Sequence, residues 1–398
     1  MRPLEGIQVL DLSRLIPGPY CSLLLADMGA EVIKVEDPQG GDHGRQTRPF
    51  IGGVSSRFLL LNRNKKSVAL NLKAEAGRRV FLQLAEKADV VVESFRPGTM
   101  DKFALEYEKV RAVNPRIIYC SISAYGQDGP YRDIVGHDIN ILGLSGLLDI
   151  TGVRHGQPII PGVTIADNAA AMFSALGILA ALLAREKTGQ GRYLDLSMLD
   201  SVVSWLFDSV QYQLALGRTP GKSEGRLWGG VPNYGVYETK DGRYITLGSL
   251  EPKFKEALLK KLGWEEPIHG QGALSPGGVA VDEELAAFLR RTLLTRTQEE
   301  WVEELEPLNL CFTPVNTVGE AVSHPQVISR RMVVEVEDPQ AGHTKIIGDP
   351  LKVSDPPVEP RPAPLLGQHT RETLAGLGYG DAEIEEMRRH GVISVPVP

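Results

Sequence analysis

The sequence predicts an α/β protein with a parallel sheet, in which both ends of the chain form a large domain and an inserted segment forms a smaller α+β domain. Three observations support this class. Short apolar runs rich in Val, Ile and Leu alternate with helical segments over the first 126 residues. Helical patterns dominate afterwards, and strand patterns return after Arg331. We therefore expect a large domain from residues 1–224 and 331–398, and a small domain at 225–330.

The N-terminal part alternates strands with helices. Residues 6–13 (GIQVLDLS) read as a strand, and 17–30 have helical spacing with Pro17 at the start and Gly29 at the end. A crossover helix between two strands implies a parallel βαβ unit. The alternation continues through strands at 31–37, 67–72, 89–94 and 116–126 and a helix at Ala74–Lys87. This pattern is typical of a doubly wound, Rossmann-like sheet.

Such sheets often bind dinucleotides, so the loop after the first strand is informative. Residues Ser13–Pro19 contain one glycine and two prolines rather than the GxGxxG pattern. Glu36 and Asp37, at the end of the second strand, occupy the place of a ribose-binding acid. Without the glycines that let a pyrophosphate approach the backbone, NAD binding is disfavoured.

The second half of the chain is mainly helical. Residues 168–187 are apolar on nearly every face, which favours a central buried helix over a membrane span. Helix is expected to continue over 194–216, and a glycine-rich stretch at 226–235 marks a boundary. Later elements are a hairpin at Asp241-Gly242, helices through 252–323, strands at 332–339 and 343–354, and two short helices within 367–391.

Composition excludes several classes of function. Hydrophobic residues make up 42% and charged residues 23%, which is ordinary for a globular chain. With 43 basic and 50 acidic side chains the net charge is −7, which disfavours nucleic-acid binding. The cysteines are Cys21, Cys120 and Cys311, too far apart to suggest a disulfide framework or a metal site. Charges within the first apolar stretch argue against a signal peptide, so we expect a cytoplasmic protein without a membrane partner.

The segment Gly136–Asn140 (GHDIN) is the first candidate for chemistry. His137 stands between Gly and Asp in front of an apolar helix, where it could act as a general base. The alternative is structural: Asp138 or Asn140 caps that helix, and His137 is a loop side chain. Position alone favours the structural alternative.

Two further carboxylates stand at the starts of expected helices. Asp167 directly precedes the long apolar helix, where it could be an N-cap or a reactive group beside unpaired N–H groups that could hold an oxyanion. Glu251, in LEPKF, follows a strand and precedes a helix. Taken alone, Glu251 is better explained as a residue of the helix cap.

Basic residues near strand ends are candidates for binding a phosphate. Arg63, Lys65 and Lys66 are expected in a loop before the strand at 67–72, where they could hold a pyrophosphate. A solvated run of charge is the usual alternative. Arg96 follows the strand at 89–94, and the carboxyl ends of parallel strands are where such sheets bind ligands.

Together these stretches resemble the family III CoA-transferases (CaiB/BaiF), a group that also contains the α-methylacyl-CoA racemases. The resemblance covers essentially the whole chain. It is carried, in order, by LEGIQVLDLSRLIPGPYCSLLLADMGAEVIKVEDPQGGD, LNRNKKSVALNLK, VVESFRPGTMDKFAL, NPRIIYCSISAYGQDGPY, GHDIN, PGVTIADNAAAMFSALGILAALLAREKTGQGRYLDLSMLD, HPQVISRRM and LGQHTRETLAGLGY.

The resemblance implies an acyl-CoA substrate, an interlocked homodimer, and no metal or cofactor other than the coenzyme A of the substrate. Its implied activity is racemisation of a 2-methylacyl-CoA, in which His137 removes the α-proton, Asp167 delivers one, and the helix start holds the enolate. Glu251 and Asp138 would orient His137. The alternative is CoA transfer to a carboxylic acid through a mixed anhydride on Asp167. The phosphates of CoA would contact Arg63, Lys65, Lys66 and Arg96.

Overall fold

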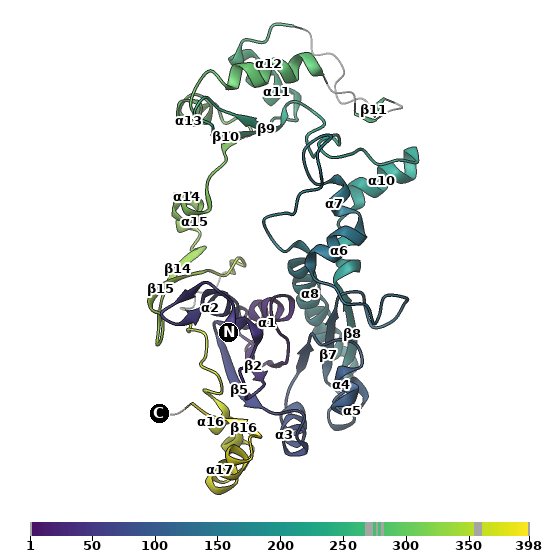
Figure 1. Ribbon diagram of the computed structural model, residues 1–398, viewed down its shortest axis with the longest axis vertical. Coiled ribbons are helices and arrows are strands. Elements are labelled where there is room, and N and C mark those ends of the chain that lie inside the picture. Colours follow the sequence, from purple (N-terminus) through teal and green to yellow (C-terminus); the bar gives the residue numbers. More distant parts are fainter. Residues whose placement is uncertain (1, 267–273, 276–277, 280–281, 354–359, 397–398) are drawn as a thin grey trace. The chain divides into compact units, whose positions relative to one another are not determined.

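The computed structural model describes residues 2–266, 274–275, 278–279, 282–353 and 360–396 (Figure 1). The chain divides into two compact units. The large unit contains Met1–Leu142, Val163–Ser204 and Pro325–Pro398, and the small unit contains Gly143–Gly162 and Trp205–His324. The predicted insertion at 225–330 therefore differs from the small unit, which also takes in 143–162 and 205–224.

A seven-stranded sheet organises the large unit, in the order β16-β5-β2-β1-β6-β7-β8. Its strands are parallel except β16, which is antiparallel to β5. The fold is therefore the predicted α/β class. The strands are β1 (Gln8–Asp11), β2 (Glu31–Glu36), β5 (Lys65–Leu70), β6 (Val90–Glu93), β7 (Ile118–Ser123), β8 (Arg192–Ser197) and β16 (Ile393–Ser394).

Successive strands are added on opposite sides of β1, so the topological switch point of the sheet lies between β1 and β6. After β1 the chain adds β2 and β5 on one side, and then β6, β7 and β8 on the other. The loops that leave β1 and β6 consequently diverge at the carboxyl edge of the sheet, which is where doubly wound sheets bind their ligands. Within the described chain, this switch point is the place to search for a site.

Helices accompany the strands of the large unit. The first, α1, begins with Pro17 at its first position, as predicted. The helices of this unit are α1 (Pro17–Asp27), α2 (Ser56–Asn62), α3 (Glu75–Ala85), α4 (Thr99–Lys102), α5 (Tyr107–Val113), α8 (Ile165–Thr188), α9 (Met198–Ser204), α15 (Pro325–Ser329), α16 (Thr370–Gly376) and α17 (Asp381–Arg389), with a 3-10 turn at His43–Gln46. Helix α6 (Asp138–Ser145) begins here and runs into the small unit.

The two ends of the chain share one core. Leu10 and Val68 of the central strands belong to the same buried cluster as Leu374 of α16 and Ile384 of α17. The C-terminal contribution differs from the prediction, however. The strands β14 (Val333–Asp338) and β15 (Gly342–Ile347) form a separate antiparallel pair, and only the short β16 joins the large sheet.

Helix α8 is the long apolar helix that the sequence predicts. By length and composition it could cross a membrane, but half of its apolar window is buried inside the protein. It packs against α1, α9 and β8. One face of α8 therefore belongs to the core, while Met172, Leu176 and Leu183 on the helix are exposed, so α8 is less completely buried than the sequence predicts.

The small unit contains a three-stranded antiparallel sheet covered by helices. Its strands are β9 (Tyr234–Glu238), β10 (Tyr244–Gly248) and β13 (Phe312–Pro314), and β9 and β10 form the predicted hairpin. Its helices are α7 (Leu147–Ile150), α10 (Phe207–Leu216), α11 (Pro252–Leu262), α12 (Glu283–Leu293), α13 (Gln298–Leu305) and α14 (Val318–Ser323), with a 3-10 turn at Glu306–Leu308. Short pairs β3 (Phe50–Ile51) with β4 (Val54–Ser55), in the large unit, and β11 (Leu274–Ser275) with β12 (Gly278–Val279) complete the described strands.

Candidate active site

A cavity of about 650 Å³ lies in the large unit and includes the loops that leave β1 and β6 in its lining. The two loops are tied together, because the backbone N–H of Arg14 donates to the Ser94 hydroxyl at 3.0 Å. The predicted residues His137, Asp138, Asp167 and Arg96 all line this cavity. Residues from three separate stretches of the sequence are thus brought to one place.

Asp167 is the third residue of α8 and is mostly buried. Burial raises the pKa of its carboxyl to about 6, and the nearby Asp138 carboxylate adds to the rise. The Thr164 hydroxyl and the charges of His137 and Arg57 act in the opposite direction. Asp167 is therefore a poorly solvated carboxylate with raised basicity, facing an open cavity.

The Asp138 carboxylate caps α8. Thr164, at the N-cap position of α8, makes no side-chain capping bond. The Asp138 Oδ1 atom fills this place and accepts from the backbone N–H groups of Ala166 at 2.6 Å and Asp167 at 3.2 Å. Two of the amides that were expected to hold an oxyanion are therefore already paired. The sequence alternative placed a cap by Asp138 on the helix that follows it, whereas the helix that Asp138 caps is α8 and not α6.

His137 is exposed at the mouth of the cavity. Its backbone N–H donates to the Asn140 Oδ1 atom at 3.0 Å, which fixes the turn into α6. Its imidazole lines the cavity and acts electrostatically on Asp167. Glu251, the residue expected to orient His137, is the exposed N-cap residue of α11 in the small unit and makes no side-chain capping bond.

Four arginines also line the cavity, and sequence reasoning identified only one of them. Arg14 stacks on the Phe95 ring at 4.8 Å, and Arg132 pairs with Asp133 at 2.8 Å. Arg57 and Arg96 are exposed and make no side-chain hydrogen bond or ion pair with the described residues. Arg14 could have been found from its place after the first strand, whereas no local pattern marks Arg57.

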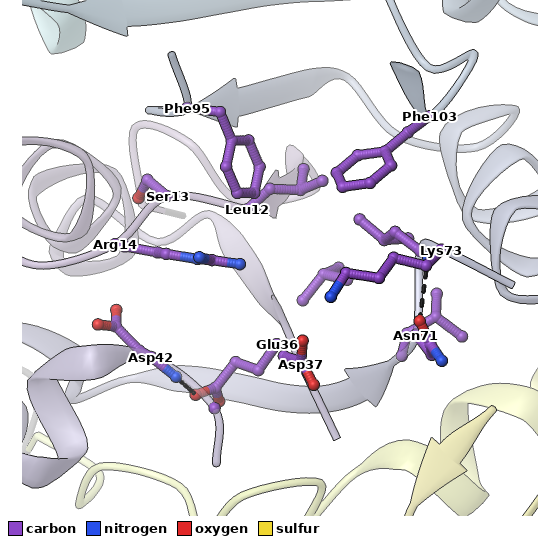
Figure 2. Close-up of a pocket in the computed structure, with 14 residues that line it drawn as sticks. Leu12, Ser13, Arg14, Glu36, Asp37, Asp42, Asn71, Lys73, Phe95 and Phe103 are labelled. Carbon is purple, nitrogen blue, oxygen red and sulfur yellow. Dashed lines mark hydrogen bonds between the residues drawn. The ribbon is translucent and has the colours of Figure 1, made fainter. Parts of the chain in front are cut away.

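A second, smaller cavity of about 40 Å³ lies at the carboxyl ends of β1, β2, β5 and β6. Figure 2 shows the Phe95 and Phe103 rings on one side of it and Arg14 reaching in from the β1 loop. Lys73 supplies a further cation to its lining. Arg14 and Phe95 also line the larger cavity, so the two cavities adjoin along these side chains.

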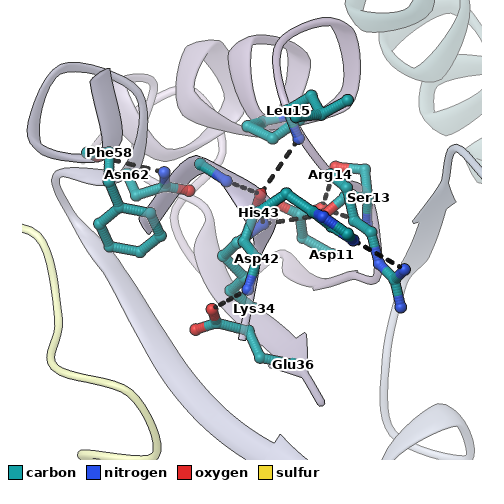
Figure 3. A network of polar contacts seen from close by, with 12 residues as sticks. Asp11, Ser13, Arg14, Leu15, Lys34, Glu36, Asp42, His43, Phe58 and Asn62 are labelled. Carbon is teal, nitrogen blue, oxygen red and sulfur yellow. Dashed lines mark hydrogen bonds and ion pairs between the residues drawn. The ribbon is translucent and has the colours of Figure 1, made fainter. Parts of the chain in front are cut away.

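The expected phosphate loop is only a short turn at Arg63 and Asn64, because β5 already begins at Lys65. Lys65 is fully buried and donates to the Asp11 Oδ2 atom at 3.2 Å. Asp11 itself belongs to a polar network with Lys34, which Figure 3 shows. Burial lowers the pKa of Lys65 to about 8.

The neighbours of Lys65 are also paired within the large unit. Arg63 pairs with Asp27, and Lys66 pairs with Glu31 at 2.7 Å. These contacts give the run Arg63–Lys66 a structural role, so Arg14, Lys73 and Arg96 are the better candidates for contacting a phosphate.

Comparison with known proteins agrees with this architecture. Residues 4–370 match the family described as CoA-transferase family III. The chain is 36% identical to the mouse succinyl-CoA:glutarate CoA-transferase over 99% of this chain and 91% of that protein. It is 33% identical to the human alpha-methylacyl-CoA racemase over 98% of this chain and 97% of that protein.

A solved structure supports the same family assignment. The crystal structure of a CaiB/BaiF family protein from Brucella suis has a TM-score of 0.80 and 30% identity, and covers 94% of this chain and 99% of its own. The predicted resemblance is confirmed: the chain belongs to family III of the CoA-transferases.

Proposed function

We propose that the protein transfers coenzyme A between an acyl-CoA thioester and a carboxylic acid, with Asp167 as the nucleophile. The observation that carries this proposal is the setting of Asp167. Its carboxylate is poorly solvated, has a raised pKa of about 6, and faces a cavity of about 650 Å³ at the switch point of the sheet. Raised basicity favours nucleophilic attack, while the group stays mainly ionised at neutral pH.

The chemistry balances without a further group. The Asp167 carboxylate attacks the thioester carbonyl carbon and the C–S bond breaks. The CoA thiolate departs, and the acyl group remains on Asp167 as a mixed anhydride. The thiolate attacks the aspartyl carbonyl of that anhydride, which releases the first acid as a carboxylate and leaves an aspartyl thioester. A second acid then reverses both steps and departs as the new acyl-CoA. No metal or redox cofactor takes part in this exchange.

The larger cavity suits the thioester end of the substrate. The nucleotide of CoA would rest against the rim of the smaller cavity, which is too small to enclose it: there Phe95 and Phe103 offer aromatic faces and Arg14 and Lys73 offer charge for phosphate groups, beside the carboxylates of Glu36, Asp37 and Asp42. The thioester would then reach Asp167 past Arg14 and Phe95, which line both cavities. The relatives support the exchange, since the mouse protein is named for succinyl-CoA and glutarate.

Racemisation of a 2-methylacyl-CoA, the activity first expected from the sequence, is the second candidate. It is favoured by one observation: His137 and Asp167 line the same cavity and interact electrostatically, as two opposed proton carriers would require. The relative named as a racemase is consistent with it. Against it, the hydrogen bonds found for the described residues of the large unit include none to the His137 imidazole, and the Oδ1 atom of Asp138 is engaged in capping α8.

One experiment separates the two activities. The protein is incubated in deuterated water with a 2-methylacyl-CoA, first alone and then with an isotopically labelled carboxylic acid. We expect labelled acyl-CoA only when the acid is present, and loss of this transfer in Asp167→Ala but not in His137→Ala. Deuterium uptake at the α-carbon without an acceptor, abolished by His137→Ala, would instead establish racemisation and contradict the proposal.

A further inference from the structure

Glu93 is a buried carboxylate that the proposed chemistry does not use. It is the last residue of β6, only 4% of its surface is exposed, and it lines neither of the two cavities. Two carboxylates buried at the ends of neighbouring strands have cationic partners: Asp11 of β1 pairs with Lys65, and Glu36 of β2 pairs with Arg45. Glu93 forms no ion pair within the described part of the chain. Because a carboxylate is costly to bury without a partner charge, a neutral side chain of the same shape would be the cheaper structural choice.

The Glu93 carboxylate holds the loop that follows β6. Its Oε2 atom accepts from the backbone N–H of Phe95 at 2.7 Å. The same loop is fastened to the loop that leaves β1, because the Arg14 N–H donates to the Ser94 hydroxyl. The Phe95 ring lies under the Arg14 guanidinium and edge-to-face against Phe103, with 6.2 Å between the two ring centroids (Figure 2). One buried carboxylate therefore fixes the backbone of an aromatic residue that lines both cavities.

The surroundings of Glu93 make this contact sensitive to pH. Burial raises the pKa of Glu93 to about 7, and the charges of Asp101 and Asp195 add to the rise. The hydroxyl of Ser121, which is the register partner of Glu93 on β7, and the Phe95 N–H favour the ionised form. Other titratable groups of the adjoining strands have pKa values far from 7 and keep one charge state there; they are Asp11, which stays ionised, and Tyr119, Cys120 and Tyr193, which stay neutral.

We propose that Glu93 is a positioning residue of the coenzyme A site, which acts through its bond to the Phe95 N–H and fixes the aromatic face against which the nucleotide rests. An ionised carboxylate accepts a hydrogen bond more strongly than a neutral carboxyl group does. Protonation of Glu93 therefore loosens the loop, and the affinity for CoA falls as the pH drops below 7. This inference rests on the location of the nucleotide beside Phe95 in the proposed function, and not on the reaction that takes place at Asp167.

The test measures equilibrium dissociation constants for CoA itself from about pH 6 to about pH 8.5. Glu93→Gln keeps the size of the side chain and an acceptor oxygen but removes the charge, so it imitates the protonated residue. At the upper pH we expect this variant to bind CoA roughly 3- to 10-fold more weakly than the wild-type protein does. Toward pH 6 the ratio of the two dissociation constants should approach one. The ratio cancels the titration of the CoA phosphates, which is the same for both proteins.

A double variant decides whether Glu93 acts through Phe95. In Phe95→Leu the aromatic face is gone, so adding Glu93→Gln should change the affinity for CoA by less than about 2-fold. The advantage of the wild-type protein over Phe95→Leu, measured with Glu93 in place in both, should itself shrink toward pH 6. The matched control is Asp101→Asn, which removes a nearby carboxylate that does not bond the loop and should not weaken CoA binding at the upper pH.

Several outcomes would overturn the inference. One is a ratio between Glu93→Gln and wild type that stays constant with pH, and another is an equal effect of Glu93→Gln with and without the Phe95 ring. Wild-type affinity in Phe95→Leu would overturn it together with the location of the nucleotide. Because CoA binds here without turnover, a protein that binds CoA as expected but transfers none would contradict the proposed function and leave the role of Glu93 standing.

Discussion

Among single residues, Asp167 has an environment that bears directly on stability as well as on reactivity. Burial and the Asp138 charge both disfavour the ionised form of its carboxyl, and they raise its pKa in the folded protein from 3.8 to about 6. The folded state therefore binds this proton more tightly than the unfolded state. This contribution to stability is full below pH 4 and is lost as the pH rises toward 6, so at neutral pH the ionised group destabilises the protein.

The residue-scale prediction is that Asp167→Asn makes the protein more stable at pH 7.5 while removing CoA transfer. After allowance for partial exposure, the gain should be about 1–2 kcal/mol. It should shrink toward zero near pH 4, and thermal unfolding at both pH values measures it. The matched control is Asp128→Asn, because Asp128 is exposed and its replacement should change little. A variant that is less stable than wild type at pH 7.5 would contradict this account of Asp167.

At the scale of elements, the start of α8 depends on a residue 28 positions earlier in the chain. Asp138 accepts from two amides of the first turn of α8 and so joins the starts of α6 and α8. Asp138→Ala should cost about 1–2 kcal/mol, the usual effect of losing a cap. Asp138→Asn keeps an acceptor oxygen and should cost less, and it should also lower the pKa of Asp167 by removing a like charge. Chemical denaturation compares the two variants; equal losses would show that capping is not the role of Asp138.

The elements also show what sequence patterns can and cannot predict. Strands β1, β2, β6 and β7 were predictable because their runs are buried on both faces. Strand β8 was missed within a segment expected to be mainly helical, since RYLDLS is largely exposed and has no continuous apolar run. The start of β5 was placed two residues late because Lys65 and Lys66 look like a loop until the buried partner Asp11 is known.

The residues of the site could also be predicted only in part. His137 and Asp167 stand at the starts of helices in recognisable motifs, and the structure brings both to one cavity. Arg57 could not be predicted, because its place in the same cavity as Asp167 arises from the packing of the large unit and leaves no trace in the neighbouring sequence. The same holds for the bond between Asp138 and α8. Long-range pairs of this kind are decided by tertiary structure rather than by local patterns.

At the scale of the whole molecule, the chain leaves the large unit and later returns to it. The return is fixed by the C-terminal segment: Gly367 N–H donates to the Ser67 hydroxyl at 2.9 Å, and the Thr370 hydroxyl accepts from Ala69 N–H at 3.0 Å. Strand β16 then closes the edge of the sheet beside β5. The excursion through the small unit therefore begins and ends in the large unit, which the interlocked dimer expected from the family resemblance requires.

The last prediction concerns that dimer. Helix α10 of the small unit presents Phe207 and Leu214 to solvent with 68% and 82% of their surfaces exposed, which is unusual for large apolar side chains unless a partner covers them. If two chains are interlocked, they cannot separate without unfolding, so dilution should not produce monomers. Tagged and untagged protein, mixed as folded dimers at micromolar concentration, should form no hybrid dimers, whereas refolding the mixture from denaturant should produce them. Light scattering that gives a monomer mass, or hybrids that appear without denaturant, would show that the chains are not interlocked.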